Sequence, residues 1–143
     1  MTAAVAVLTL ATAGTALAAL SPSQYRSQAA VICKASSAKL SKIKSPKSAA
    51  GYNKFFKAAL PIFRVQYAGL KKLKPPKALS FLHSKALSLE KTQLDGIQAL
   101  IRQIDGGADP AKAYKATDAK LTRVGNAETA TWKKLKIDAC ANI

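Results

Sequence analysis

Few side chains of this 143-residue sequence could take part in covalent, redox or metal chemistry. The chain has two cysteines, Cys33 and Cys140, and one histidine, His83. Cysteine and histidine bind zinc when the ligands are closely spaced, but the chain has no C-x-x-C pair and no C-x-x-C-H haem motif. The sequence therefore predicts no metal site and no cofactor.

The acidic residues are too widely scattered to form a carboxylate pair in the local sequence. They are Glu90, Asp95, Asp105, Asp109, Asp118, Glu128 and Asp138. Acid–base catalysis needs titratable groups that converge on one point, and G-x-S-x-G, H-E-x-x-H and phosphate-cradling glycine loops are missing. His83, in the segment FLHSK, is expected at a helix surface or edge rather than as a base. We interpret the chain as non-enzymatic, although distant residues could still converge in the fold.

Positive charge dominates the composition. Nineteen lysines and four arginines stand against seven acids, so the formal net charge is +16. Residues 1–89 hold fourteen basic side chains and no acid, whereas the rest of the chain is nearly balanced. Such a charge attracts nucleic acid, anionic lipid or acidic wall polymers, but it also serves as a plain solubilising coat.

Two lysine clusters coincide with breaks in the helical pattern and are candidate binding sites. One lies in the segment GLKKLKPPK and consists of Lys71, Lys72, Lys74 and Lys77. The other ends the first predicted helix and consists of Lys42, Lys44 and Lys47. Lysine lacks the planar, two-pronged geometry of arginine, and no aromatic residue is interleaved with the first cluster. Sequence-specific nucleic-acid recognition is therefore disfavoured.

The N-terminal segment has the composition of an export signal. Residues 1–18 carry no charged side chain, and Ala16, Leu17 and Ala18 give the small-x-small pattern that precedes signal cleavage. We expect residues 19–143 to form the mature domain, secreted or held in the cell envelope. The alternative is an uncleaved N-terminal membrane anchor, although four threonines and Gly14 make a poor spanning helix.

Beyond this segment, apolar residues recur at intervals of three and four, which predicts helices. Breaker residues divide the pattern at 44–51, 74–77 and 105–110. Ser21-Pro22 and Asp109-Pro110 are typical helix starts, because a capping side chain precedes a proline in the first turn. Four helices of roughly 20 to 28 residues with short connections predict an all-α, up-down-up-down four-helix bundle.

The second predicted helix begins near Ser48 and contains five of the nine aromatic residues, so we expect it to supply most of the core volume. Pro61 lies inside this helix and should kink it, because proline removes the hydrogen bond to the Lys57 carbonyl. The kink is either a tolerated bend or a device that shapes a small-molecule pocket.

The two cysteines of an exported chain most simply pair with each other. In the predicted bundle the first and fourth helices are adjacent, with Cys33 halfway along one and Cys140 just beyond the other. A disulfide between them would hold the C-terminal tail against the bundle, and the chain-entropy model gives it up to about 4.7 kcal/mol. Free thiols are the alternative.

Several segments resemble a group of small exported, alanine-rich helical proteins of actinobacteria and their relatives. These segments are YRSQAAVIC, KAALPIF, LKKLKPP and NAETATWKKLKIDAC. The resemblance implies a two-cysteine helical bundle with Cys33 and Cys140 at the paired positions, and it implies no activity. Lys136 replaces the usual glycine of the terminal motif, where a left-handed helix stop is expected.

We therefore expect an exported, non-catalytic envelope protein that binds anionic polymer or lipid through its lysine-rich surface, with binding that weakens as salt rises. Two alternatives stay open. One is a structural or protein-interaction module whose lysines are only solvated. The other is a small-molecule carrier that uses a bundle pocket near Pro61.

Overall fold

The computed structural model describes residues 20–141, except for the side chains of residues 49 and 50. The predicted signal segment, residues 1–18, lies outside the described residues. Within that range the chain is all-helical. Its helices are α1 (Pro22–Leu40), α2 (Ala49–Lys72), α3 (Lys77–Asp105), α4 (Pro110–Lys134) and the short α5 (Asp138–Ala141). The predicted all-α class is confirmed.

Three helices begin at the residues that the sequence predicts. Ser21 accepts a hydrogen bond from the Gln24 amide, and the Gln24 side chain accepts one from the Ser21 amide, which closes a capping box. Ser48 and Asp109 cap α2 and α4 by accepting from backbone amides three residues further on. These caps satisfy amides that the first turn of a helix leaves unpaired, so the boundaries follow from local sequence.

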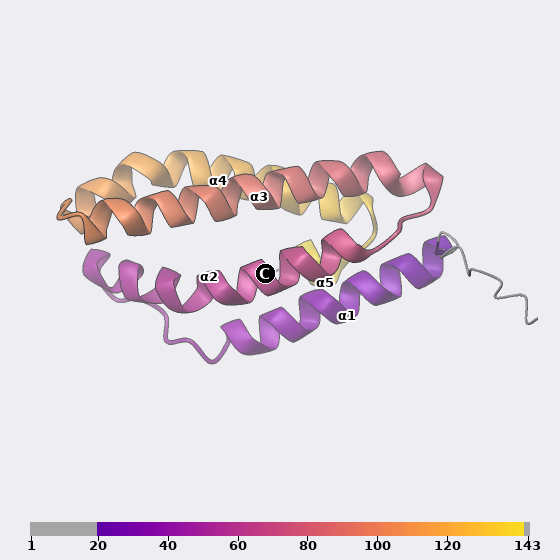
Figure 1. Cartoon of the computed structure of the whole chain (residues 1–143), viewed down its shortest axis with the longest axis horizontal. Helices are drawn as coiled ribbons and strands as arrows, with labels where there is room; N and C mark the ends of the chain where they lie inside the picture. The colour runs from indigo at the N-terminus through magenta and orange to yellow at the C-terminus, as the bar shows by residue number, and fades with distance from the viewer. Residues whose placement is uncertain (1–19, 142–143) are drawn as a thin grey trace, which may run out of the picture.

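The long helices lie side by side, and the chain reverses direction at each connection (Figure 1). α3 packs against both α2 and α4, and α2 also contacts α4. α1 packs on α2 and on α5, and it has no extensive contact with α4. The expectation that the first and fourth helices are close neighbours is therefore wrong, because α5 packs against both of them in the position where they would meet.

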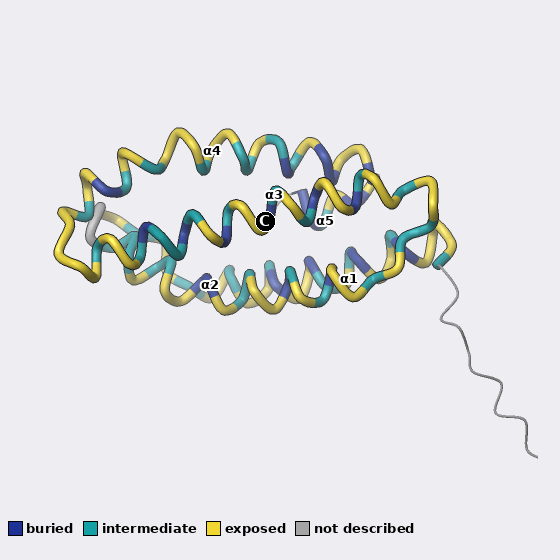
Figure 2. Tube along the Cα trace, turned by 45° about the horizontal axis from the view of Figure 1, so that its top comes forward, coloured by how far each residue is buried: buried dark blue, intermediate teal, exposed yellow. Residues whose placement is uncertain are grey.

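Buried residues lie on the sides of the helices that face one another (Figure 2) and form two clusters. The larger cluster joins α1, the end of α2, the start of α3 and the C-terminal segment. It consists of Tyr25, Ala29, Cys33, Leu70, Ala86, Trp132, Leu135, Ile137, Cys140 and Ala141. The smaller cluster joins α2 to α3 and consists of Leu60, Leu94 and Ile97.

The aromatic residues of α2 do not supply most of the core, contrary to the prediction. The two largest fully buried side chains are Trp132 of α4 and Tyr25 of α1. The aromatic side chains of α2 are all only partly buried; they are Tyr52, Phe55, Phe56, Phe63 and Tyr67. Tyr52 stacks on Tyr114 of α4 at a centroid distance of 4.3 Å, whereas Phe56, Phe63 and Tyr67 pack around the smaller cluster.

The chain turns back after α4 through a left-handed residue, Lys136, whose φ is 59°. The Ile137 amide donates to the Trp132 carbonyl over 3.1 Å, and the Lys136 amide donates to the Lys133 carbonyl over 2.9 Å. These are the two hydrogen bonds of a Schellman stop, and Ile137 and Trp132 also belong to the same core cluster. The stop expected for glycine thus forms with lysine, because this packing holds the backbone in place.

Cys33 and Cys140 are joined by a disulfide with 5.1 Å between their Cα atoms, which confirms the predicted pairing. The link crosses from α1 to α5 inside the larger cluster. Close by, Arg26 Nε donates to the Leu135 carbonyl over 2.9 Å. Both contacts tie the C-terminal segment to α1.

Replacing Lys136 with glycine should stabilise the protein by about 1 kcal/mol. A non-glycine residue in the left-handed region costs about 1–2 kcal/mol, and the greater freedom of glycine in the unfolded chain offsets part of the gain. The melting temperature should rise by roughly 2–4 °C. Lys134→Gly, which removes the same charge from the last turn of α4, should lower the melting temperature instead. A melting temperature for Lys136→Gly at or below that of the wild type would contradict the strain argument.

Candidate functional site

The lysines of the α2–α3 connection belong to a larger exposed group at one end of the molecule. The group consists of Lys71, Lys72, Lys74 and Lys77 together with Lys133, Lys134 and Lys136, all of them exposed. The two segments lie at the same end because Leu73 and Leu135, which these lysines flank, pack in the same core cluster. We refer to these seven residues as the basic end. The sequence predicted only its first four members, since the other three follow some 60 positions later.

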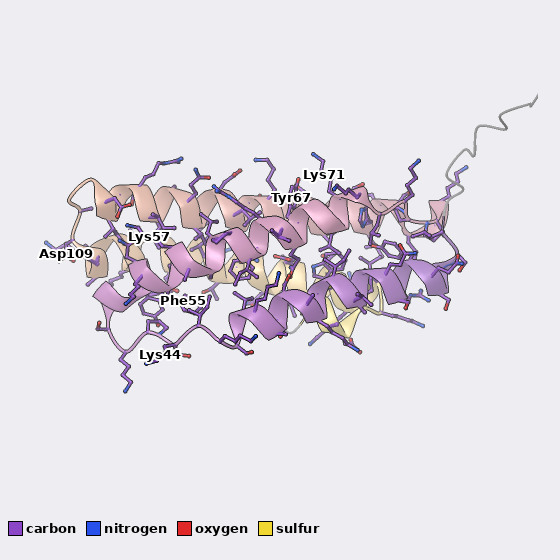
Figure 3. All side chains as sticks on the ribbon, turned by 60° about the horizontal axis from the view of Figure 1, so that its bottom comes forward. Lys44, Phe55, Lys57, Tyr67, Lys71 and Asp109 are labelled. Carbon is purple, nitrogen blue, oxygen red and sulfur yellow. A yellow bond between two sulfur atoms is a disulfide. The ribbon has the colours of Figure 1, made fainter. Side chains whose placement is uncertain are left out.

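The second predicted patch, Lys42, Lys44 and Lys47, is exposed at the opposite end, in the connection between α1 and α2. In Figure 3, Lys44 lies at the same end as Asp109, whereas Tyr67 and Lys71 lie further along α2 toward the other end. The two predicted patches therefore form two separate surfaces.

Surface acids compensate little of this charge. Asp105 pairs with Lys57, and Asp95 pairs with Lys91, each with an N–O distance of 2.6 Å. α1 and α2, which pack on each other, contain no acidic residue. Asp138 is the one acid close in sequence to the basic end in the described part of the chain.

An exposed aromatic side chain lies beside the basic end. Phe81 of α3 is 76% exposed, and Lys77 and Lys85, four residues before and after it, lie on the same side of the helix. The Lys71 ammonium also lies 6.0 Å from the centroid of the Tyr67 ring. The prediction that no aromatic accompanies these lysines considered only neighbours in sequence, whereas a spacing of four residues brings side chains together on a helix.

His83 is buried, and the prediction that it lies at a helix surface or edge is wrong. It is 5% exposed, and its Nδ1 shares a hydrogen bond of 2.8 Å with Tyr25 Oη. Burial lowers the pKa of His83 and raises the pKa of Tyr25 to about 12. The helical register explains the position, since His83 precedes Ala86 and Glu90 on the buried side of α3. His83 therefore connects α3 to α1 within the core.

A cavity of about 430 Å³ lies between α2, α3 and α4, within the usual size range of small-molecule sites. Apolar side chains from all three helices form much of its wall; they are Phe63, Leu94, Ile97 and Leu121. Asp118, Thr122 and Asn126 of α4 also line it and are exposed, so they form its rim.

Pro61 itself does not line this cavity, but Phe63, two residues further along α2, does. α2 continues as a helix from Ala49 to Lys72, and Pro61 lies on its exposed side. A proline is tolerated there because solvent can satisfy the carbonyl that it leaves unpaired. α2 contributes Phe56, Phe63 and Gln66 to the cavity instead.

Two glutamates that lie far apart in sequence face the cavity. Glu90 of α3 is 4% exposed and Glu128 of α4 is 8% exposed. Gln66 Nε2 donates to Glu90 Oε1 over 3.1 Å. Glu128 accepts from Trp132 Nε1 over 3.1 Å and from Gln93 Nε2. Among the described residues, Glu90 Oε2 and Gln66 Oε1 have no hydrogen-bond partner.

The protein interior disfavours the ionised form of both carboxyls. Burial raises the pKa of Glu90 to about 8, repulsion from Glu128 adds to this effect, and the hydrogen bond from Gln66 opposes it. Burial also raises the pKa of Glu128, against the hydrogen bonds from Trp132 and Gln93. Sequence reasoning missed the pair because it compared each acid with its neighbours in sequence. Glu90 continues the spacing of Ala86, Leu94 and Ile97, and that register could have identified it.

In residues 20–141, no group of three or more histidine, cysteine, aspartate or glutamate side chains is arranged to hold a metal ion. None of the helices described for this range combines the length and the apolar character needed to cross a membrane. Comparison with protein-family models, with curated proteins and with solved structures gives no match for the chain. The resemblance to exported two-cysteine proteins therefore stays a prediction, and the function is argued from the residues.

Replacing Glu90 with glutamine should stabilise the protein at mildly alkaline pH but not at acidic pH. The pKa of the Glu90 carboxyl is higher in the folded protein than in the unfolded protein. It makes its full contribution to stability only at a pH where it is protonated in both the folded and the unfolded protein. The wild-type protein should therefore lose stability as the pH rises from 4.5 toward about 8. Glutamine has no proton to lose, so the advantage of the variant should grow to a few kcal/mol at most over this range. Urea denaturation at a series of pH values measures the difference in stability between the variant and the wild type.

Asp95→Asn is the matched control, because it removes an exposed carboxylate from the same helix. This control should show little pH-dependent gain. Equal denaturation midpoints for Glu90→Gln and the wild type at every pH would contradict the burial of an ionisable carboxyl.

Proposed function

We propose that this chain is an exported, non-catalytic envelope protein that binds an anionic surface through its basic end. The observation that carries the proposal is the gathering of seven exposed lysines from two distant segments beside the exposed Phe81. Each lysine near an anionic membrane contributes about 1 kcal/mol, so several together can hold the protein without any specific contact.

The exposed Phe81 favours anionic lipid over an anionic polymer as the main partner. Lysines alone attract either of them. An aromatic ring between Lys77 and Lys85 can also enter the apolar boundary below lipid headgroups, whereas it gains little from a hydrated polymer. Acidic envelope polymer is accordingly the weaker partner in this proposal.

Export and an up-down-up-down order of α1 to α4 belong to the same proposal, with residues 1–18 as the signal. The chain reversal at each connection supports this order (Figure 1). The Cys33–Cys140 disulfide supports export, because disulfides persist in oxidising compartments. The non-catalytic role is proposed from the sequence, which contains neither G-x-S-x-G nor H-E-x-x-H.

Replacing Lys71, Lys72, Lys74 and Lys77 with glutamine should weaken binding to phosphatidylglycerol vesicles by up to roughly 1,000-fold, since four contributions of about 1 kcal/mol are lost. Binding of the wild-type protein should fall steeply as salt rises, because mobile ions screen the attraction. Co-sedimentation of the oxidised protein with vesicles over a salt series measures both effects.

The matched control replaces Lys42, Lys44, Lys47 and Lys54 with glutamine, which removes the same charge at the other end of the molecule. This variant should retain most of the affinity for vesicles. Phe81→Ser should weaken binding to vesicles but not to soluble polyphosphate. Equal losses in the two fourfold variants would show that the lysines act as a uniform coat. Absence of vesicle binding even at low salt would contradict the proposed function.

A further inference from the structure

We propose that the cavity between α2, α3 and α4 binds a small organic cation, an ammonium group on an apolar body, with the ammonium held by Glu90 and Gln66. This site is separate from the basic end, and it does not depend on the proposed binding of anionic surfaces.

Two polar side-chain atoms of the described residues that line the cavity are left without hydrogen-bond partners. Glu90 Oε2 and Gln66 Oε1 have no partner in the described part of the chain, and both residues are 4% exposed. The Gln66 amide oxygen only accepts hydrogen bonds, and Glu90 Oε2 does so once the carboxyl is ionised, so a group that satisfies both atoms of the ionised site must be a donor. Buried polar atoms without partners are uncommon in folded proteins, and here both belong to residues that line an accessible cavity.

The charge around the cavity favours a cationic donor over a neutral one. Glu128 faces the cavity from α4, and Asp118 lies on its rim. The chain has 23 basic residues, yet none of the described ones lines the cavity. Mobile ions screen the surface lysines over about 8–10 Å, while the buried carboxyl is screened much less.

Beside the polar Gln93, Thr122, Asn126 and Thr129, the lining has an apolar part that fits an apolar body. The ring and aliphatic side chains are Phe56, Phe63, Leu94, Ile97, Tyr114 and Leu121. Phe56 and Tyr114 lie with their rings 6.5 Å apart at the end of the cavity away from Glu128. A polyamine would place further charges against these apolar walls, so a ligand with a single cationic group fits better.

Binding of the cation should release a proton from Glu90. Burial and repulsion from Glu128 raise the pKa of Glu90 to about 8, so at neutral pH the carboxyl is largely protonated, and an ammonium favours its ionised form. The other titratable groups that line the cavity are Glu128, Asp118 and Tyr114 of α4, while α2 contributes only uncharged residues and α5 only the disulfide-bonded Cys140. Affinity should therefore rise between about pH 6 and pH 8.

Isothermal titration calorimetry of the oxidised protein with phenethylammonium tests the proposal. Phenethyl alcohol has nearly the same shape without the charge and should bind at least roughly tenfold more weakly. Titrations at neutral pH in two buffers of different ionisation enthalpy should show the release of close to one proton for each ammonium bound.

Glu90→Gln should weaken phenethylammonium binding by at least roughly tenfold and abolish the proton release. Asp95→Asn removes an exposed carboxylate from the same helix and should change neither quantity. Equal binding of the ammonium and the alcohol, or unchanged ammonium affinity in Glu90→Gln, would overturn the proposal. The absence of saturable ammonium binding at millimolar concentrations would overturn it as well.

Discussion

The burial of Glu90 and Glu128 is the constraint on which the arrangement of α2, α3 and α4 depends. A carboxyl removed from water must be protonated or hydrogen-bonded, because a bare buried charge is very costly. The hydrogen bond from Gln66 to Glu90 connects α2 to α3, and the one from Gln93 to Glu128 connects α3 to α4. These polar contacts specify the register of three helices that apolar contacts alone would leave free to slide.

The same burial separates the charges of the molecule. Two of the seven acids lie inside and two more pair with lysines at the surface, so the lysines of the basic end remain largely uncompensated. The cavity is correspondingly a place where negative charge can develop. The proposed surface site thus uses the exposed lysines, and the proposed cavity site uses the buried carboxyls. The rim residues Asp118 and Asn126 of α4 are not part of the basic end and would take no part in binding a membrane there.

The parts of the fold that depend on a few neighbouring residues could be predicted from the sequence. The caps at Ser21 and Asp109 are of this kind, and the disulfide required only two cysteines and an oxidising compartment. The candidate site depends on which side each helix turns inward, which local signals do not determine. The expectation for His83 was therefore wrong and the pairing of Glu90 with Glu128 was missed, because polar side chains are usually assumed to face water. The left-handed stop at Lys136 is likewise held by packing between Trp132 and Ile137 and not by the residue itself.

Carboxyl-carbon NMR of the protein labelled in glutamate tests the charge separation most directly, because Glu90 and Glu128 are the only two glutamates of the chain. The spectra of the wild type and of Glu90→Gln assign the two signals. We expect both signals to titrate above 4.5 and the Glu90 signal to do so near pH 8. Two signals that both titrate near 4.5 would place these carboxyls in water and contradict the account.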